Sequence, residues 1–250
     1  MRYQTAEGGL DKCYTAGMLN NRRVVITGAS RGVGYQIVRR FLADGAQVLG
    51  VGRNPKNLHK VDREFRSYGK LWSCVRADVG TPAGARKIAQ AAKRRWSAVD
   101  LLINNAGISP GHPSFATETD DALETTLATN LLGPHRIIRA LLPLLRKGKH
   151  PRVVNVSSGA GSEGSISTGT NMSSYRLSKW CLNGLTRLWA NELKGKISVI
   201  AMDPGWVKTD MGGPQAPDSP LLSAKRAAEI AELPFKITGT YQAGKHRGGW

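Results

Sequence analysis

The chain has little cysteine, no long apolar run and no apolar N-terminus. Its 250 residues include three cysteines, Cys13, Cys74 and Cys181, and no Cys-x-x-Cys pair. This sparse, odd set argues against a disulfide framework or a metal site and favours a reducing compartment. The most apolar stretch, Ile137–Leu145, is far shorter than the roughly 18 residues that cross a bilayer. No apolar run follows Arg2, so we expect neither a secretory signal nor a membrane partner, and a cytoplasmic location.

Acidic residues are scarce beside basic ones. The chain has 36 Lys and Arg against 18 Asp and Glu, a formal net charge of +18. Residues 53–100 hold 12 basic and 4 acidic residues, which is +8 in one short segment. Such a segment attracts nucleic acid, acidic membranes or phosphorylated small molecules, and composition does not choose among them. No recognised nucleic-acid module accompanies it, so we expect no specific nucleic-acid partner.

Apolar runs of strand length alternate with helical patterns from Arg22 onward. The expected strands are Arg23–Thr27, Ala46–Val51, Leu71–Val75, Val99–Asn104, Arg152–Val156 and Ile197–Ala201, and the expected helices are Gly32–Ala43, 81–96, 119–146 and 173–193. This alternation predicts an α/β fold, a single Rossmann-type doubly wound parallel sheet with helices on both faces, over residues 22–250. Pro134 and Pro143 should bend or split the helical pattern over 119–146.

Residues 1–21 are polar and show no clear period. We expect an N-terminal extension without regular structure. A mitochondrial-targeting function for this segment is opposed by Glu7 and Asp11, because such segments are poor in acidic residues.

A glycine-rich turn joins the first expected strand to the first expected helix. It consists of Thr27, Gly28, Ala29, Ser30, Arg31, Gly32, Val33 and Gly34. Glycines allow a tight turn and a close approach of backbone to phosphate, while the helix N-terminus offers free amides and a positive dipole end. A strand before the turn and a helix after it are the context that a dinucleotide-binding site requires.

The end of the second strand lacks an acidic residue. An acidic side chain there usually holds a free ribose 2′-hydroxyl, whereas this chain has Arg53, with Arg31 able to approach from the glycine turn. Two guanidinium groups suit a 2′-phosphate, so we expect NADP(H). After the third strand come Asp78 and Val79. Asp78 would either contact the adenine amino group or cap the next helix, and both interpretations stay open.

Further motifs follow in a fixed order. They are Asn104-Asn105-Ala106-Gly107, Asn130, Asn155-Val156-Ser157-Ser158, Tyr175-x-x-x-Lys179 and Pro204-Gly205-Trp206-Val207-Lys208-Thr209. With these motifs the chain resembles the short-chain dehydrogenase/reductase family over residues 22–212. From Val153 onward it looks most like the small carbonyl-reductase branch, including Thr238–Tyr241 and the closing Trp250.

Tyr175 and Lys179 are four residues apart, so their side chains share one face of a helix. A free tyrosine has a pKa near ~10, and a neighbouring ammonium is expected to lower it toward a useful range. The resemblance makes Tyr175 the general acid and base. It also implies that Lys179 holds the nicotinamide ribose, that Ser158 polarises the substrate oxygen and that Asn130 holds a water.

Two serines compete for the substrate-polarising role. The family's spacing to the tyrosine favours Ser162, whereas the position at the strand end favours Ser158, which we prefer; Ser157 would point to the opposite side. The resemblance also implies cofactor contacts from Asn104, Asn105, Ala106 and Gly107 at the adenine ribose or as sheet support, and from Pro204, Gly205, Val207 and Thr209 at the nicotinamide.

The loop over 159–172 and a lid over 210–235 are expected to set substrate specificity. The resulting hypothesis is an NADP(H)-dependent oxidoreductase acting on a small-molecule carbonyl or alcohol substrate. A binding protein that uses its basic surface on RNA or another polyanion is the alternative, and an extended-branch epimerase or dehydratase is disfavoured by the short C-terminal part. The resemblance implies a homodimer or homotetramer through 119–146 and 173–193, with a monomer also found among relatives of this branch.

Overall fold

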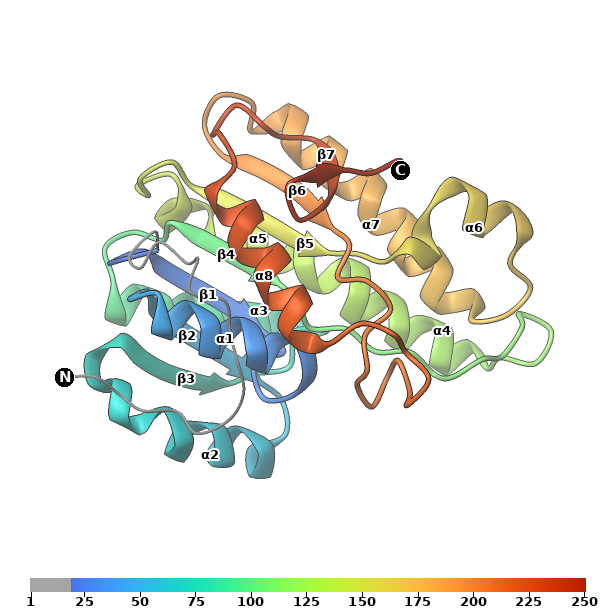
Figure 1. The fold of residues 1–250 in the computed structure, drawn as a ribbon, viewed down its shortest axis with the longest axis horizontal. Coiled ribbons are helices and arrows are strands. Elements are labelled where there is room, and N and C mark those ends of the chain that lie inside the picture. The colour runs from blue at the N-terminus through green and yellow to red at the C-terminus, as the bar shows by residue number, and fades with distance from the viewer. Residues whose placement is uncertain (1–18) are drawn as a thin grey trace.

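A twisted, mostly parallel sheet runs through the molecule (Figure 1). In the computed structural model, which describes residues 19–250, its strands are β1 (Arg23–Thr27), β2 (Gln47–Gly52), β3 (Trp72–Arg76), β4 (Leu101–Asn104), β5 (Arg152–Val156), β6 (Ser198–Met202), β7 (Thr240–Ala243) and β8 (His246–Arg247). Their order is β3-β2-β1-β4-β5-β6-β7-β8, with β8 antiparallel to β7 and the other pairs parallel. The strand order reverses between β1 and β4, so the expected doubly wound Rossmann-type fold is confirmed.

Helices cover both faces of this sheet. They are α1 (Gly32–Ala43), α2 (Pro55–Glu64), α3 (Pro82–Arg95), α4 (Asp120–Leu127), α5 (Gly133–Leu145), α6 (Glu163–Thr168), α7 (Ser173–Glu192) and α8 (Pro220–Glu232). One apolar core joins the sheet to α1 and α8, and a second joins its other face to α3, α5 and α7. Among the described residues, no helix is both long enough and apolar enough to span a bilayer.

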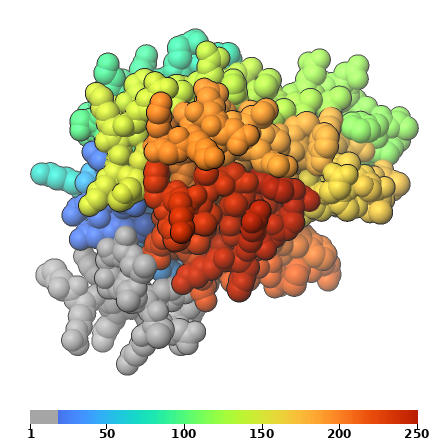
Figure 2. Space-filling view, turned by 90° about the horizontal axis from the view of Figure 1, so that it is seen from above, coloured from blue at the N-terminus to red at the C-terminus, as the bar shows by residue number. Residues whose placement is uncertain are grey.

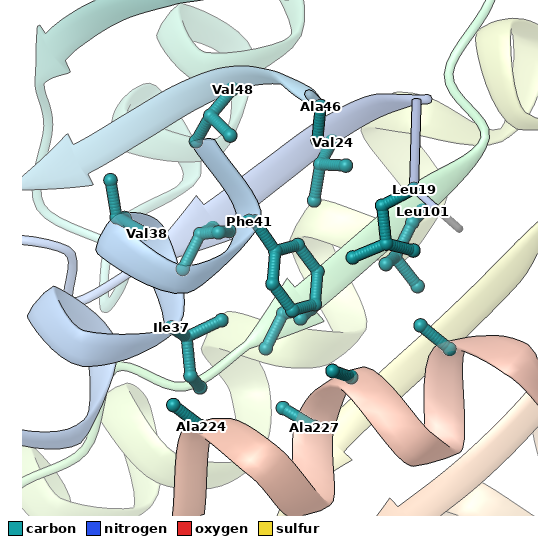
Figure 3. Packing of buried hydrophobic residues seen from close by; sticks show 14 of the residues in the cluster. Leu19, Val24, Ile37, Val38, Phe41, Ala46, Val48, Leu101, Ala224 and Ala227 are labelled. Atoms are coloured by element: carbon teal, nitrogen blue, oxygen red, sulfur yellow. The ribbon is translucent and has the colours of Figure 1, made fainter. Parts of the chain in front are cut away.

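The core beneath α1 includes a residue from the expected N-terminal extension. Leu19 is fully buried in the same cluster as Phe41 of α1, whose ring points toward α8 near Ala227, while Ile37 of α1 lies above Ala224 (Figure 3). Residues 19–21 therefore belong to the packed domain, and the rest of the expected extension lies outside the described residues. Truncating a buried ring such as Phe41 typically costs about 3–5 kcal/mol of stability.

The expected lid over 210–235 is wrong for its second half. Residues 220–232 form α8, whose alanines pack on α1 in the core, and the exposed segment ends before Ser219. The signal was present in the sequence, because Ser219 caps the helix and Pro220 occupies its first turn. The same combination, Asn54 followed by Pro55, begins α2, which also went unpredicted.

The helical pattern over 119–146 is split, as expected. A π-helical turn at Ala128–Leu132 separates α4 from α5, and Pro134 lies in the first turn of α5, where a missing N–H costs little.

The prediction of a loop over 159–172 is wrong in part, because this segment contains α6 with Ser162 as its N-cap. The C-terminal segment packs against α6, because the Glu163 N–H donates to the Trp250 carbonyl. In Figure 2 the red atoms of the C-terminal segment contact the yellow atoms of the α6 region.

Candidate active site

A cleft of about 730 Å³ opens at the carboxyl ends of the parallel strands, where the arrowheads lie in Figure 1. It brings together side chains and backbone from segments far apart in the sequence. The predicted site residues that line it are Gly28, Ser30, Arg31, Gly32, Val33, Gly34, Arg53, Asp78, Val79, Asn105, Ala106, Gly107, Tyr175, Lys179, Pro204 and Thr209. The predicted residues outside its lining are Thr27, Asn104, Asn130, Ser158, Gly205 and Val207.

The glycine-rich turn allows α1 and a ligand to approach its backbone closely. Gly28 has a φ of +67°, a conformation that favours glycine. A Cβ on Gly34 would lie 2.2 Å from the Gly28 carbonyl oxygen, so the first turn of α1 can sit against the turn only without a side chain. Arg31 is the N-cap of α1 and its side chain does not cap the helix, which leaves the first amides open to a ligand. This arrangement fits a pyrophosphate.

Asn105 and Thr27 hold the turn in place. The Asn105 amide donates to the Thr27 and Gly28 carbonyls at 2.9 and 3.3 Å. The Thr27 hydroxyl accepts from the backbone N–H groups of Asn105 and Ala106, both at 3.0 Å. Asn104 is buried between strands, where it donates to Asn155 at 2.9 Å, so it supports the sheet rather than contacting a ligand in the cleft.

Each arginine predicted at the 2′-phosphate has a carboxylate partner. Arg31 pairs with Asp210 at 2.7 Å and Arg53 with Asp78 at 3.6 Å, and both arginine side chains are about two-thirds exposed. Exposed pairs of this kind contribute little, about 0–1 kcal/mol, so an incoming phosphate can compete for the arginines. Lys208 also lines the cleft, a cation in the Pro204–Thr209 motif to which no role was assigned.

The alternatives for Asp78 are resolved in part. Thr81 is the N-cap of α3, since its hydroxyl accepts from the Gly84 N–H at 3.0 Å. Asp78 accepts from the Gly80 N–H at 2.9 Å and faces Arg53 along the cleft, so it is not the cap of this helix.

Tyr175 and Lys179 are buried together on α7. The Lys179 ammonium lies 5.6 Å from the centre of the Tyr175 ring and donates to the Val156 carbonyl at 2.8 Å. Burial raises the pKa of Tyr175, a hydrogen bond with the Ser158 side chain opposes that rise, and the Asp203 carboxylate adds to it. The predicted lowering of the Tyr175 pKa is therefore wrong for this structure. Burial also lowers the pKa of Lys179, to about 8.

The three serines have different surroundings. The Ser158 side chain is hydrogen-bonded to Tyr175 and accepts from the Ala160 N–H at 3.1 Å. Ser162 caps α6, where its hydroxyl accepts from the Ser165 N–H at 3.3 Å. The buried Ser157 hydroxyl donates to Asn183 at 2.7 Å. Ser158 is thus the serine beside the Tyr175 hydroxyl.

Asn130 lies in the π-helical turn and is buried. Its amide group donates to the Ile108 carbonyl at 2.8 Å and to Ser178 at 3.0 Å, while its oxygen accepts from the Ile108 N–H at 2.9 Å. These bonds fasten the segment after β4 to α7. The side chain is fully engaged with protein groups, so the water expected at Asn130 would have to be held by its backbone.

Asp203 and Tyr241 are residues near the site to which sequence reasoning assigned no role. Asp203 follows β6, accepts from the Gly205 N–H at 2.9 Å and lies beside Gly159, whose added Cβ would be 3.7 Å from its carboxylate. Tyr241 is buried on neighbouring β7, and burial together with Asp203 raises its pKa. Because β6 and β7 are paired, Asp203 and Tyr241 lie together, close enough to Tyr175 to interact electrostatically with it. No local motif in the sequence predicts this arrangement.

Comparisons with known proteins agree with this geometry. Residues 22–220 match the family model described as short chain dehydrogenase. A 3-oxoacyl-[acyl-carrier-protein] reductase of rhamnolipid biosynthesis from Pseudomonas aeruginosa is 32% identical, over 89% of this chain and 91% of that protein.

Two solved structures are similar over nearly their whole length. NADPH-bound carbonyl reductase from chicken fatty liver has a TM-score of 0.84 at 30% identity, covering 93% of this chain and 100% of that one. The carbonyl reductase Sniffer of Drosophila melanogaster has the same TM-score at 26% identity, covering 92% and 100%. NADPH in the first of these is the cofactor type that Arg31 and Arg53 predict here.

Proposed function

Because the chain belongs to the short-chain dehydrogenase/reductase family of oxidoreductases, we propose that it transfers a hydride between NADP(H) and a carbonyl or secondary-alcohol substrate. The observation that carries this proposal is that Tyr175 and Lys179 line the same cleft as the glycine-rich turn, with the Ser158 side chain hydrogen-bonded to Tyr175. The carbonyl reductases among its structural relatives support the reductive direction.

The residues of the cleft fit a dinucleotide. The free amides of α1 and the glycine turn would hold the pyrophosphate, and Arg31 and Arg53 would hold the 2′-phosphate. Asn105 to Gly107 would lie along the adenine ribose, and Pro204 and Thr209 along the nicotinamide. When bound, the reduced cofactor supplies the hydride.

Tyr175 would supply the proton. Its raised pKa keeps the hydroxyl protonated at neutral pH, which suits donation to a carbonyl oxygen as negative charge develops there. Ser158 would donate a second hydrogen bond to that oxygen. The positive charge of the Lys179 ammonium would stabilise the Tyr175 phenolate that remains after the proton has left. In the reverse direction the phenolate would accept the alcohol proton.

We expect a preference for NADPH over NADH of at least tenfold in kcat/KM. A charged hydrogen bond is worth about 1.5–3 kcal/mol, and each ~1.4 kcal/mol is a factor of ten. Replacing Arg53 by Asp should erode or reverse this preference, because a carboxylate repels the 2′-phosphate and accepts a bond from a free 2′-hydroxyl. Steady-state kinetics with both cofactors measures it.

The matched control for this charge reversal is Arg66→Asp. Arg66 is exposed and does not line the cleft, so the same change in net charge there should leave the cofactor ratio unaltered. Equal use of NADH and NADPH by the unaltered chain would show that Arg53 and Arg31 do not hold the phosphate.

Asp203→Asn should shift alcohol oxidation toward lower pH. The Asp203 carboxylate raises the pKa of Tyr175, and removing its charge stabilises the phenolate and so lowers that pKa. Asparagine keeps an oxygen for the Gly205 N–H. The measurement is the pH dependence of kcat/KM for oxidation, with Asp121→Asn, a change at an exposed residue of α4, as control. An unshifted profile would exclude Asp203 as a tuning group.

The substrate is proposed only as a class. A panel of ketones, aldehydes and quinones, followed by NADPH absorbance, tests it directly.

The sparse cysteines lead us to propose a cytoplasmic location. Pairing of α4, α5 and α7 between copies is the proposed route to a dimer or tetramer, and the mass of the protein in solution decides between these and a monomer.

A further inference from the structure

Six basic residues gather at the edge of the sheet where the strands begin. We call them the basal basic face: Lys93, Arg94, Arg95, Arg146, Lys147 and Lys149. The segment that follows α3 meets the end of α5 here, since the Val99 N–H donates to the Leu144 carbonyl at 3.1 Å. A hollow of about 410 Å³ between them is lined by Lys93, Arg94, Arg95 and Lys147. The cleft with Tyr175 lies at the opposite edge of the sheet.

The positive charge of this face is not compensated. Residues 79–99 and 133–151, which supply it, contain no Asp or Glu. No ion pair found in residues 19–250 involves any of the six side chains. The nearby Asp100 is buried and already paired with Arg23 at 2.9 Å, while it also accepts from the Lys149 N–H.

Helix dipoles account for only part of this arrangement. A cation in the last turn of a helix gains about 0.3–1 kcal/mol from the dipole, which favours Lys93, Arg94 and Arg95 at the end of α3. Lys147 and Lys149 follow α5 and add like charges to the same region. Mutual repulsion among six cations opposes the dipole gain, so a dense face of one sign is most readily explained by an anionic partner.

We propose that the basal basic face binds the phosphate backbone of nucleic acid without sequence preference. Phosphodiester chains present closely spaced charges, and arginine and lysine bind them by releasing counterions. Four of the six cations line one shallow hollow, where a backbone phosphate can reach several of them together. Ser97 at its rim adds a hydroxyl that can donate to a phosphate oxygen.

An acidic membrane fits this face less well. Peripheral membrane surfaces add apolar anchors to their charge. Within the described part of the chain, the large apolar side chains that are exposed lie between Phe115 and Leu222, and none belongs to α3 or to the segment 139–150. Charge without anchors favours a polyanion in solution.

The test compares two triple variants of equal charge. Lys93→Gln/Lys147→Gln/Lys149→Gln removes exposed lysines of the face, and Lys60→Gln/Lys225→Gln/Lys245→Gln removes exposed lysines elsewhere. Each lowers the net charge from +18 to +15 (18 − 3 = 15). The full-length protein is titrated into a fluorescent random-sequence DNA duplex of about 20 base pairs, and anisotropy is followed across a salt series.

The face variant should bind at least tenfold more weakly near ~100 mM salt, and its slope of log K against log salt should be shallower by about two to three. The control variant should keep the original slope and affinity. Equal losses in both variants would show attraction by net charge alone and overturn the proposal. Binding to phosphatidylserine vesicles but not to the duplex would also overturn it. Unchanged melting temperatures establish that both variants are folded. Carbonyl reduction is measured in a separate assay, because the basal basic face lies away from the cleft.

Discussion

Replacing Tyr175 by phenylalanine is expected to abolish carbonyl reduction while leaving the affinity for NADPH nearly unchanged. The phenyl ring keeps the packing of this buried position and removes only the hydroxyl that donates the proton. General acid catalysis contributes about 100-fold to 10,000-fold, so kcat should fall by at least that lower figure. Single-turnover kinetics measures the chemistry, and fluorescence titration measures the cofactor affinity.

Tyr241→Phe is the matched control for this change. Tyr241 is also buried, and its hydroxyl interacts with the Asp203 carboxylate rather than with the cleft. It lies on β7, outside the lining of the cleft, so its phenylalanine variant should keep most of the turnover. Substantial turnover by the Tyr175→Phe enzyme would refute Tyr175 as the proton donor.

Ser158→Ala is expected to lower kcat by about 100-fold to 1,000-fold, the usual effect of removing one donor to a developing oxyanion. Ser162→Ala should leave kcat nearly intact and cost about 1 kcal/mol of stability, because Ser162 caps α6. Ser158→Thr should restore part of the activity, since it returns the hydroxyl. The opposite order of kcat losses would transfer the polarising role to the loop over 159–172.

Most of the sheet could be predicted because its strands are apolar runs separated by amphipathic helices. The observed limits of β1 and β5 equal the expected ones, and the other predicted strands differ by one or two residues, as with β2, which begins at Gln47 rather than Ala46. Two of the helices that were not predicted, α2 and α8, have few periodic apolar residues but begin with a capping residue and a proline. Alanine carries a weak hydrophobic signal, yet the alanines of α8 complete the core against α1.

The candidate site was predictable where a local motif carries the chemistry. The glycine turn, Asn105 and the Tyr175–Lys179 pair are short-range patterns, and the fold brings them to one cleft. Asp203 could not be assigned this way, because its effect on Tyr175 arises from the packing of β5 beside β6. Burial also reverses the expected direction of the Tyr175 pKa, a consequence of tertiary structure that residue spacing does not reveal.

The most direct test of hydride transfer uses NADPH carrying deuterium at the transferable position of its nicotinamide. The protein is incubated with this cofactor and the best ketone or aldehyde of the panel, and the alcohol is analysed by mass spectrometry. The proposed mechanism predicts one deuterium on the carbinol carbon, in an amount equal to the cofactor oxidised, and none with Tyr175→Phe. Failure to oxidise NADPH with any ketone, aldehyde or quinone, or an alcohol that carries no deuterium, would contradict it.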